Sequence, residues 1–279
     1  MSKLFRSRES NVTATDAKTQ LTLLGSQTAP GPLLVPGAMS HLLGAYVICM
    51  SDSAAAESGA FLVRLEGPGI ARGSFVFAAG GAGADVATGG AGTLPATYIP
   101  IGIKVTPGQE ILVFAEQLGT DLGTSTVGVT LVFSTEAGAG GETLAEITVE
   151  GEVTAIDTLT RLTTQGSVTA PSRLTPPDAK MLKRLVYSIG HDGGAAGQAA
   201  MVLRLSGDAI KGGEQTLFFA GHTSQTVQAG SDAAPYLMAP LVIEDLDIEI
   251  TPNETLDVAI EHVGVDVGDT TNVVTVMFA

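Results

Sequence analysis

The chain repeats itself, and this duplication restricts the folds open to it more than any other feature. When the sequence is displaced by 141 positions, residues 12–48 meet residues 153–189 with 17 identities. When it is displaced by 145 positions, residues 106–134 meet residues 251–279 with 11 identities. Self-similarity of this kind indicates two copies of one structural unit. Each copy is long enough to bury a hydrophobic core of its own.

Several positions with distinctive residue types are identical in the two copies. The matched pairs of this kind are Asp16 with Asp157, Gly25-Ser26 with Gly166-Ser167, Tyr46 with Tyr187, Arg64 with Arg204, and Phe133 with Phe278. We expect the tyrosine, arginine and phenylalanine pairs to have structural roles, the same in both copies.

The repeats predict four parts of the chain. These are an N-terminal arm at 1–11, a first repeat at 12–134, an acidic glycine-rich linker at 135–152, and a second repeat at 153–279. The linker composition is typical of a flexible connection. Residues 144–153 alternate between apolar and polar side chains, however, which indicates that a strand begins within the linker.

Short apolar or alternating segments fill each repeat, and glycine, proline, asparagine or aspartate lies at almost every junction between them. This spacing predicts an all-β fold with seven or eight strands in each repeat, arranged as a β-sandwich or barrel. Residues 42–50 form a nearly continuous apolar run, which predicts a strand buried on both faces. The glycine-rich segment 78–94 is expected to be a surface loop.

Composition excludes some functions. The chain has 14 Lys and Arg against 29 Asp and Glu, a formal net charge of −15, and only 15% charged residues. Nucleic-acid binding needs clustered cations, so such a surface is not expected to be the main function. The 44% hydrophobic content argues against disorder. A surface so poor in charge favours burial against other subunits.

Catalytic motifs are nearly absent. No two of the four histidines have the short spacing of zinc ligands, and neither a Gly-x-Ser-x-Gly motif nor a phosphate-binding loop with its lysine occurs. The single cysteine, Cys49, lies in an apolar strand, and we expect it in the core. We therefore predict that the chain is not an enzyme and has no cofactor.

One acidic motif occurs in both repeats, Glu-x-x-Gly-x-Asp-x-Gly. It contains Glu116 and Asp121 in the first repeat and Glu261 and Asp266 in the second. Closely spaced carboxylates can bind calcium, so these four residues are weak calcium candidates. The alternative, which we favour, is a Gly/Asp turn between two antiparallel strands.

Basic residues gather in two places. The N-terminal arm has Lys3, Arg6 and Arg8, which we expect to contact nucleic acid, a lipid headgroup or an acidic neighbouring surface. The alternative is a disordered tail. The second repeat alone has the cluster Lys180, Lys183 and Arg184. Neither a signal peptide nor an apolar run long enough to span a membrane is expected.

Two β-sandwich domains in tandem, no catalytic set, a low-charge surface and a short basic arm resemble the double-jelly-roll major capsid proteins of tailless icosahedral viruses. The resemblance lies in the architecture, and no functional residue is carried over from it. It implies two eight-stranded jelly rolls side by side and three chains in a capsomer with a pseudo-sixfold outline. The present repeats are more alike than the two barrels of that family usually are, and the long loops that form towers are missing.

We therefore predict a structural protein of the virion, a major capsid protein that self-assembles through the sides of its barrels into trimers and an icosahedral shell. Its expected partners are copies of itself and other virion proteins, with the genome or an inner membrane contacted through the arm, and no small-molecule substrate. Alternatives are a capsid cement or decoration protein, or a tandem module that binds carbohydrate or a cell surface. Such a module would need exposed aromatic platforms, and the chain has no Trp and four Tyr.

Overall fold

The computed structural model describes residues 2–25, 27–28, 31–51, 57–84, 92–93, 96–119, 123–191, 197–224, 236–264 and 269–279. The regular structure in these residues is β-strand, which confirms the all-β prediction. The strands form four antiparallel sheets, consistent with β-sandwiches. In the described residues no helix is long and apolar enough to cross a membrane.

The first and second sheets are built almost entirely from the first half of the chain. The first has the order β10-β6-β12-β1-β3-β4 with β9 beside β6, and its strands are β1 (Lys3–Val12), β3 (Leu23–Leu24), β4 (Gln27–Thr28), β6 (His41–Ser51), β9 (Gly92–Thr93), β10 (Thr97–Lys104) and β12 (Ser125–Ser134). The second has the order β2-β11-β7-β8-β20 with β5 beside β11, and its strands are β2 (Thr19–Gln20), β5 (Leu33–Leu34), β7 (Glu57–Glu66), β8 (Ser74–Ala84), β11 (Glu110–Gly119) and β20 (Tyr236–Met238).

The third and fourth sheets come from the second half. The third has the order β16-β15-β13-β24-β17-β21 with β22 beside β17, and its strands are β13 (Ala145–Val153), β15 (Thr164–Gln165), β16 (Val168–Thr169), β17 (Met181–His191), β21 (Leu241–Ile243), β22 (Ile248–Glu249) and β24 (Thr270–Phe278). The fourth has the order β14-β23-β18-β19, and its strands are β14 (Thr160–Arg161), β18 (Gly197–Ser206), β19 (Gln215–Ser224) and β23 (Asp257–Gly264).

Both halves therefore use one strand order. The path β10-β6-β12-β1 corresponds to β21-β17-β24-β13, and the path β2-β11-β7-β8 corresponds to β14-β23-β18-β19. Alternate side chains of each strand point into a core, where Phe133 of β12 and Phe278 of β24 are fully buried at equivalent positions. One core lies between the first and second sheets and the other between the third and fourth.

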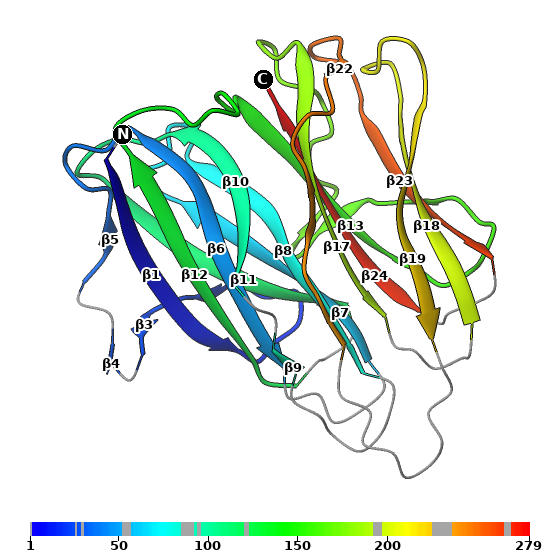
Figure 1. Cartoon of the computed structure of the whole chain (residues 1–279), viewed down its shortest axis with the longest axis horizontal. Coiled ribbons are helices and arrows are strands. Elements are labelled where there is room, and N and C mark those ends of the chain that lie inside the picture. The colour runs from blue at the N-terminus through cyan, green and yellow to red at the C-terminus, as the bar shows by residue number, and fades with distance from the viewer. Residues whose placement is uncertain are drawn as a thin grey trace.

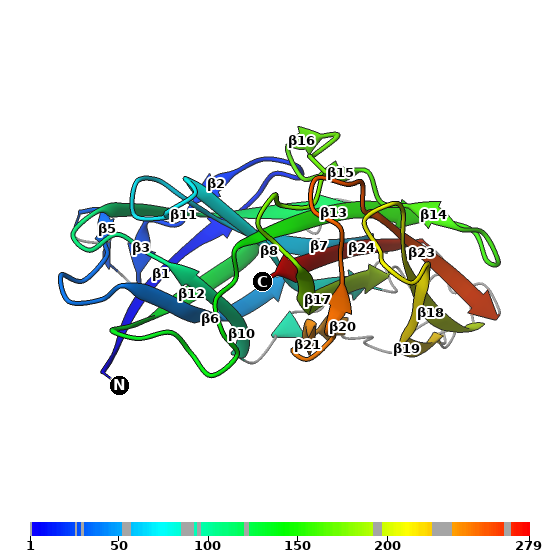
Figure 2. The ribbon, with the colours of Figure 1, turned by 90° about the horizontal axis from the view of Figure 1, so that it is seen from above.

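The two halves also pack on each other (Figure 1). Val186, Val273 and Met277 lie on the outer face of the third sheet, and they belong to the core of the first half. Strand β8 at the margin of the second sheet lies against β13 and β24 of the third, as Figure 2 shows from above. Strand β20, from the second half of the chain, extends this margin by pairing with β8.

Residues 3–11, expected within an N-terminal arm, form β1 together with Val12. This strand pairs with β12 along its whole length, from Lys3 opposite Ser134 to Val12 opposite Ser125. The segment is thus part of the first sheet and is not a detached tail. In the second half, β13 has the corresponding place beside β24, so the strand expected at the end of the linker is present.

The equivalence drawn between Tyr46 and Tyr187 is wrong by one residue. Val132 pairs with Gly44, and the equivalent Met277 pairs with Arg184, so β6 and β17 correspond at a displacement of 140 rather than 141. A slip of one residue moves a side chain to the opposite face of a sheet. Tyr46 is accordingly 40% exposed, whereas Tyr187 is buried and donates to Asn272 Oδ1 at 2.7 Å.

Candidate functional site

A buried ion pair lies at the junction of the two halves. Arg64 on β7 and Glu116 on the neighbouring β11 point out of the second sheet, away from its core, and Arg64 Nε donates to Glu116 Oε1. Both residues are buried, Glu116 completely. A charged pair taken out of water needs further hydrogen bonds to be tolerated, and the second half of the chain supplies them.

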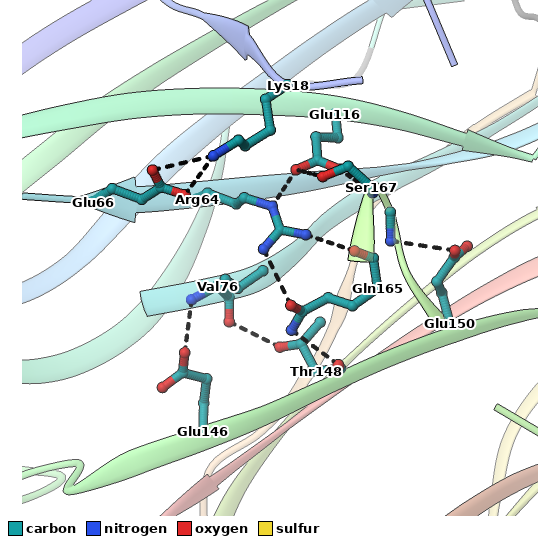
Figure 3. Close-up of polar contacts among 11 residues, drawn as sticks. Lys18, Arg64, Glu66, Val76, Glu116, Glu146, Thr148, Glu150, Gln165 and Ser167 are labelled. Carbon is teal, nitrogen blue, oxygen red and sulfur yellow. Dashed lines mark hydrogen bonds and ion pairs between the residues drawn. The ribbon is translucent and has the colours of Figure 1, made fainter. Parts of the chain in front are cut away.

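The hairpin of β15 and β16 covers this pair (Figure 3). Arg64 Nη1 donates to Gln165 Oε1 at 3.1 Å, and Nη2 donates to the Gln165 carbonyl at 2.6 Å. The backbone N–H of Ser167 donates to Glu116 Oε2 at 2.8 Å. Between them Gly166 has a φ of +55°, and a Cβ there would lie 2.0 Å from Glu116 Oε2. The hairpin can approach so closely because this residue is glycine.

A second set of contacts joins the part of β8 that does not pair with β20 to the outer face of the third sheet. The N–H of Val76 donates to Glu146 Oε1, and the Val76 carbonyl accepts from Thr148 Oγ1, both at 2.9 Å. The N–H of Ala78 donates to Thr275 Oγ1, also at 2.9 Å. Thr148 and Thr275 are bonded to each other through their hydroxyls at 2.9 Å. Side chains thus satisfy backbone groups that a further strand would otherwise pair.

Burial makes this junction electrostatically unusual. It raises the pKa of Glu146 to about 7, although the Val76 N–H opposes the shift. Burial also raises the pKa of Glu150, against the hydrogen bond from Thr164 Oγ1 at 2.7 Å. The pKa of Asp16 is raised by burial and then by the nearby charge of Glu116. The charged form of Glu146 is therefore disfavoured at the contact between the halves.

The second repeat has the same Arg–Glu pair, but in a different environment. Arg204 Nη2 donates to Glu261 Oε2 at 2.6 Å, and Arg204 Nη1 donates to Glu214 Oε1 at 2.9 Å. The Arg204 side chain is 34% exposed, against 6% for Arg64. Hydrogen bonds from Arg204 to Glu261 and Glu214 raise its pKa. The pair lies on the outer face of the fourth sheet, at the surface of the molecule.

The predicted calcium candidates fall into two groups. Glu116 and Glu261 each accept hydrogen bonds from an arginine, so a guanidinium already neutralises each carboxylate. Asp121 and Asp266 lie outside the described residues, and calcium binding stays a prediction. In the part of the chain that the structure describes, no group of three or more His, Cys, Asp or Glu is placed to hold a metal ion.

The predicted basic residues of the arm lie on strand β1. Because side chains alternate along a strand, Lys3 points to the opposite face from Arg6 and Arg8. Arg8 donates to the carbonyls of Ser7 and Gly31, and burial lowers its pKa, with a further contribution from the charge of Arg6. The structure therefore does not gather the three cations into one patch.

The cluster found only in the second repeat is also divided. Arg184 is buried, donates to Thr143 Oγ1 at 2.8 Å and also contacts the Gly140 carbonyl, so it anchors the segment between the halves. Lys183 forms an ion pair with Asp247 at the surface. Burial lowers the pKa of Arg184. The structure therefore gives Arg184 and Lys183 different environments and different partners.

The junction was not among the sites predicted from the sequence. Two parts of the junction do occur in the sequence as repeated motifs. One is the arginine, Arg64 in the first repeat and Arg204 in the second, and the other is the Gly-Ser turn, at 25–26 and at 166–167. Nothing in the sequence indicated that the turn of one repeat would cover the arginine of the other. Glu146 and Thr148 gave no signal, because they lie in a segment assigned to the linker.

No family model and no curated protein matches the chain. Solved structures match it distantly. One is the amidase PNGase F, with a TM-score of 0.39, 9% identity, and coverage of 98% of this chain and 95% of that one. Another is PNGase F from Flavobacterium meningosepticum, described as a glycosylasparaginase, with a TM-score of 0.34, 8% identity and coverage of 96% of each chain. A third is the major capsid protein P2 of bacteriophage PM2, with a TM-score of 0.29, 12% identity, and coverage of 99% of this chain and 97% of that one.

These matches correct one prediction. The expectation that the chain is not an enzyme is contradicted, because the structures with the higher TM-scores of these three are those of an amidase. The absence of the few catalytic motifs on which the prediction rested does not exclude enzymes of other classes. Structures from viruses, a major capsid protein among them, are also present among the distant structural neighbours.

Proposed function

We propose that the chain is a structural protein that self-assembles into a virion shell, with each repeat folded as a jelly roll. The strand order is the observation that carries the proposal. With the eight main strands of a repeat numbered along the chain, one sheet has the order 1-8-3-6 and the other 2-7-4-5, in both halves. Alternation between two four-stranded sheets in this way is the jelly-roll arrangement, which is frequent in capsid proteins.

An exposed apolar face supports self-association. The outer face of the first sheet has Phe5, Tyr46, Met50 and Tyr98, which are 51%, 40%, 38% and 37% exposed. Tyr46 and Tyr98 are opposite each other in the ladder, with ring centroids 5.0 Å apart. Apolar side chains gathered on one face of a soluble protein commonly mark a contact with another molecule. In the proposal that molecule is another copy of the chain, as a step toward trimers and then a shell.

The same tyrosine pair favours a second candidate, a tandem module that binds carbohydrate. Exposed aromatic rings are the platforms that such a module needs, and Tyr46 with Tyr98 is one in the described residues. The second candidate predicts a soluble monomer whose binding to a glycan array is lost in Tyr46→Ala. If the chain is a shell protein, we expect no binding to the glycan array that depends on Tyr46.

The mass of the purified protein in solution, measured by light scattering with negative-stain images of the same sample, tests the proposal. We expect oligomers that convert into closed particles as concentration rises. A monomer at all concentrations would overturn the proposal. The same monomer should then be assayed for glycan binding and for cleavage of an N-glycosylated peptide, which would assign it as a binding module or as an enzyme.

A further inference from the structure

We infer that copies of this chain bind one another head to tail, through a contact that repeats the one between the two halves. In that contact the fourth sheet of one copy meets the outer face of the first sheet of the next, as the second sheet meets the third within one chain. The inference rests on the proposed self-assembly and specifies the surfaces that assembly uses. Four correspondences between covered and free surfaces carry it.

The first correspondence is a pair of hydroxyl groups. Thr148 and Thr275, which bind the edge of β8, are hydrogen-bonded to each other at 2.9 Å. Their counterparts on the first sheet, by displacements of 141 and 145, are Ser7 and Thr130, whose hydroxyls are also 2.9 Å apart. Both pairs lie on the outer face of their sheet. In the first sheet this pair faces outward, beside the exposed apolar side chains.

The second correspondence is the edge strand itself. β19 ends the fourth sheet as β8 ends the four main strands of the second, and it pairs with β18 on one side. Val76 of β8 lies opposite Arg64, and Thr216 of β19 lies opposite Arg204, so these two residues correspond. Thr216 is exposed. An edge strand with open backbone groups is a template for another chain, and the hydroxyl pair is a partner of matching chemistry.

The third correspondence is the hairpin and the arginine that it covers. Gly166 and Gly25 have similar left-handed conformations, with φ of +55° and +61°. A Cβ on Gly166 would meet Glu116, whereas a Cβ on Gly25 would meet nothing within 4 Å. Arg64 is covered, and its counterpart Arg204 is at the surface. Both surfaces of the internal contact, the hairpin and the arginine, therefore have a counterpart elsewhere in the chain that is not covered.

The fourth correspondence lies in the residues that differ. By the same displacement of 141, Gln165 and Glu146 of the covered surface are replaced on the first sheet by Leu24 and Phe5, which are 46% and 51% exposed. Arg204 uses Nη1 for Glu214 of its own repeat, so it needs no acceptor in the place of Gln165, and Leu24 offers none. The free surface is thus more apolar at these two positions, as suits a contact between separate molecules. It keeps one carboxylate, because Glu9 has the place of the buried Glu150.

A contact that joins two different surfaces either closes into a ring or extends as a filament. It can therefore be blocked from either side. Thr130→Arg places a charge on the outer face of the first sheet, and Arg204→Glu reverses the charge on the fourth. Asp178→Arg, at an exposed position in the connection before β17, is the matched control. Thermal unfolding of all three variants verifies that they fold.

We expect Thr130→Arg and Arg204→Glu each to weaken assembly of the full-length protein about tenfold or more, while the control assembles as the wild type does. An equimolar mixture of the two blocked variants should form dimers and nothing larger, because each supplies one intact surface. The inference is overturned if the wild type assembles but both variants assemble equally well, or if the mixture of blocked variants stays monomeric. In those cases the proposed self-assembly survives, whereas a monomeric wild type overturns both.

Discussion

The repeated Arg–Glu pair allows one substitution to be compared in two environments within one protein. Glu116→Gln keeps the shape of the buried side chain and one acceptor for the Ser167 N–H, but it removes the charge that Arg64 faces. Glu261→Gln makes the same change opposite Arg204, at the surface. Any difference between the two variants therefore measures the effect of covering the pair with the β15–β16 hairpin.

The magnitude follows from burial. Removing one partner of a buried pair leaves the other charge uncompensated and typically costs about 3–5 kcal/mol. Arg64 is 5% exposed and Glu116 is fully buried, so the full range applies to Glu116→Gln. The exposed Arg204 keeps its contact with water and with Glu214, and Glu261→Gln should leave the free energy of unfolding nearly unchanged.

Urea unfolding followed by circular dichroism provides the measurement. For a slope of about 2 kcal/mol/M, Glu116→Gln should lower the midpoint by about 1.5–2.5 M. The double variant Arg64→Leu/Glu116→Leu should recover most of this loss, because an apolar pair leaves no charge unpaired. Equal midpoints for Glu116→Gln and Glu261→Gln would refute the reasoning, because they would mean that the junction does not exclude water.

Three further predictions concern the same molecule. Because the pKa of Glu146 is raised from 4.5 to about 7, its ionisation opposes folding, so stability should fall as pH rises from about 4.5 to about 7. Glu146→Gln should flatten that slope and add up to about 3 kcal/mol at pH 8; a slope unchanged by the substitution would contradict this. Gly166→Ala should lower the melting temperature clearly more than Gly25→Ala, since both strain a left-handed residue but only the first meets Glu116; equal losses in calorimetry would exclude the close contact. Burial raises the pKa of the Cys49 thiol to about 12, so a thiol reagent at pH 8 should label the protein only after unfolding; rapid labelling of the native protein would be inconsistent with a buried thiol.

The all-β strands of both repeats could be predicted because each repeat buries the apolar side chains that alternate along its strands, at equivalent positions. Phe133 and Phe278 illustrate this, since both are fully buried at the same place in β12 and β24. Strand β1 was not predicted, because its sequence does not match that of its counterpart β13. Its outer face contacts solvent and that of β13 contacts β8, so the two strands have diverged in sequence although their pairing is the same.

Two further errors have physical causes. Residues 78–84 were expected in a loop because of their glycines, yet β8 continues to Ala84. A Cβ on Gly81 would lie 1.7 Å from the Ile189 carbonyl oxygen, so glycine here permits a close approach of two strands rather than a turn. The run at 42–50 was expected to be buried on both faces, but Tyr46 and Met50 are exposed. Only one face of this strand packs in the core, and the apolar side chains of the other face belong to the surface that we propose as a contact between copies.

The junction could be predicted only in part, because its two components come from different repeats. The sequence shows that Arg64 and Gly166 each have a counterpart, but not that the hairpin of one repeat reaches the arginine of the other. That information depends on how the halves pack. The halves pack through hydrogen bonds between the edge of β8 and the hydroxyls of Thr148 and Thr275. In the sequence these two threonines look like polar residues on the solvent side of an alternating strand.

An electron cryomicroscopy map of the assembled wild-type protein would test the central claim most directly. The account predicts that Arg204 and Glu261 of one copy lie beneath the β3–β4 hairpin of the next, with its Gly25 against the Glu261 carboxylate. Ser7 and Thr130 should then face the edge of β19 of the neighbouring copy. An assembly in which Arg204 and Glu261 face solvent, or in which like surfaces meet, would contradict it.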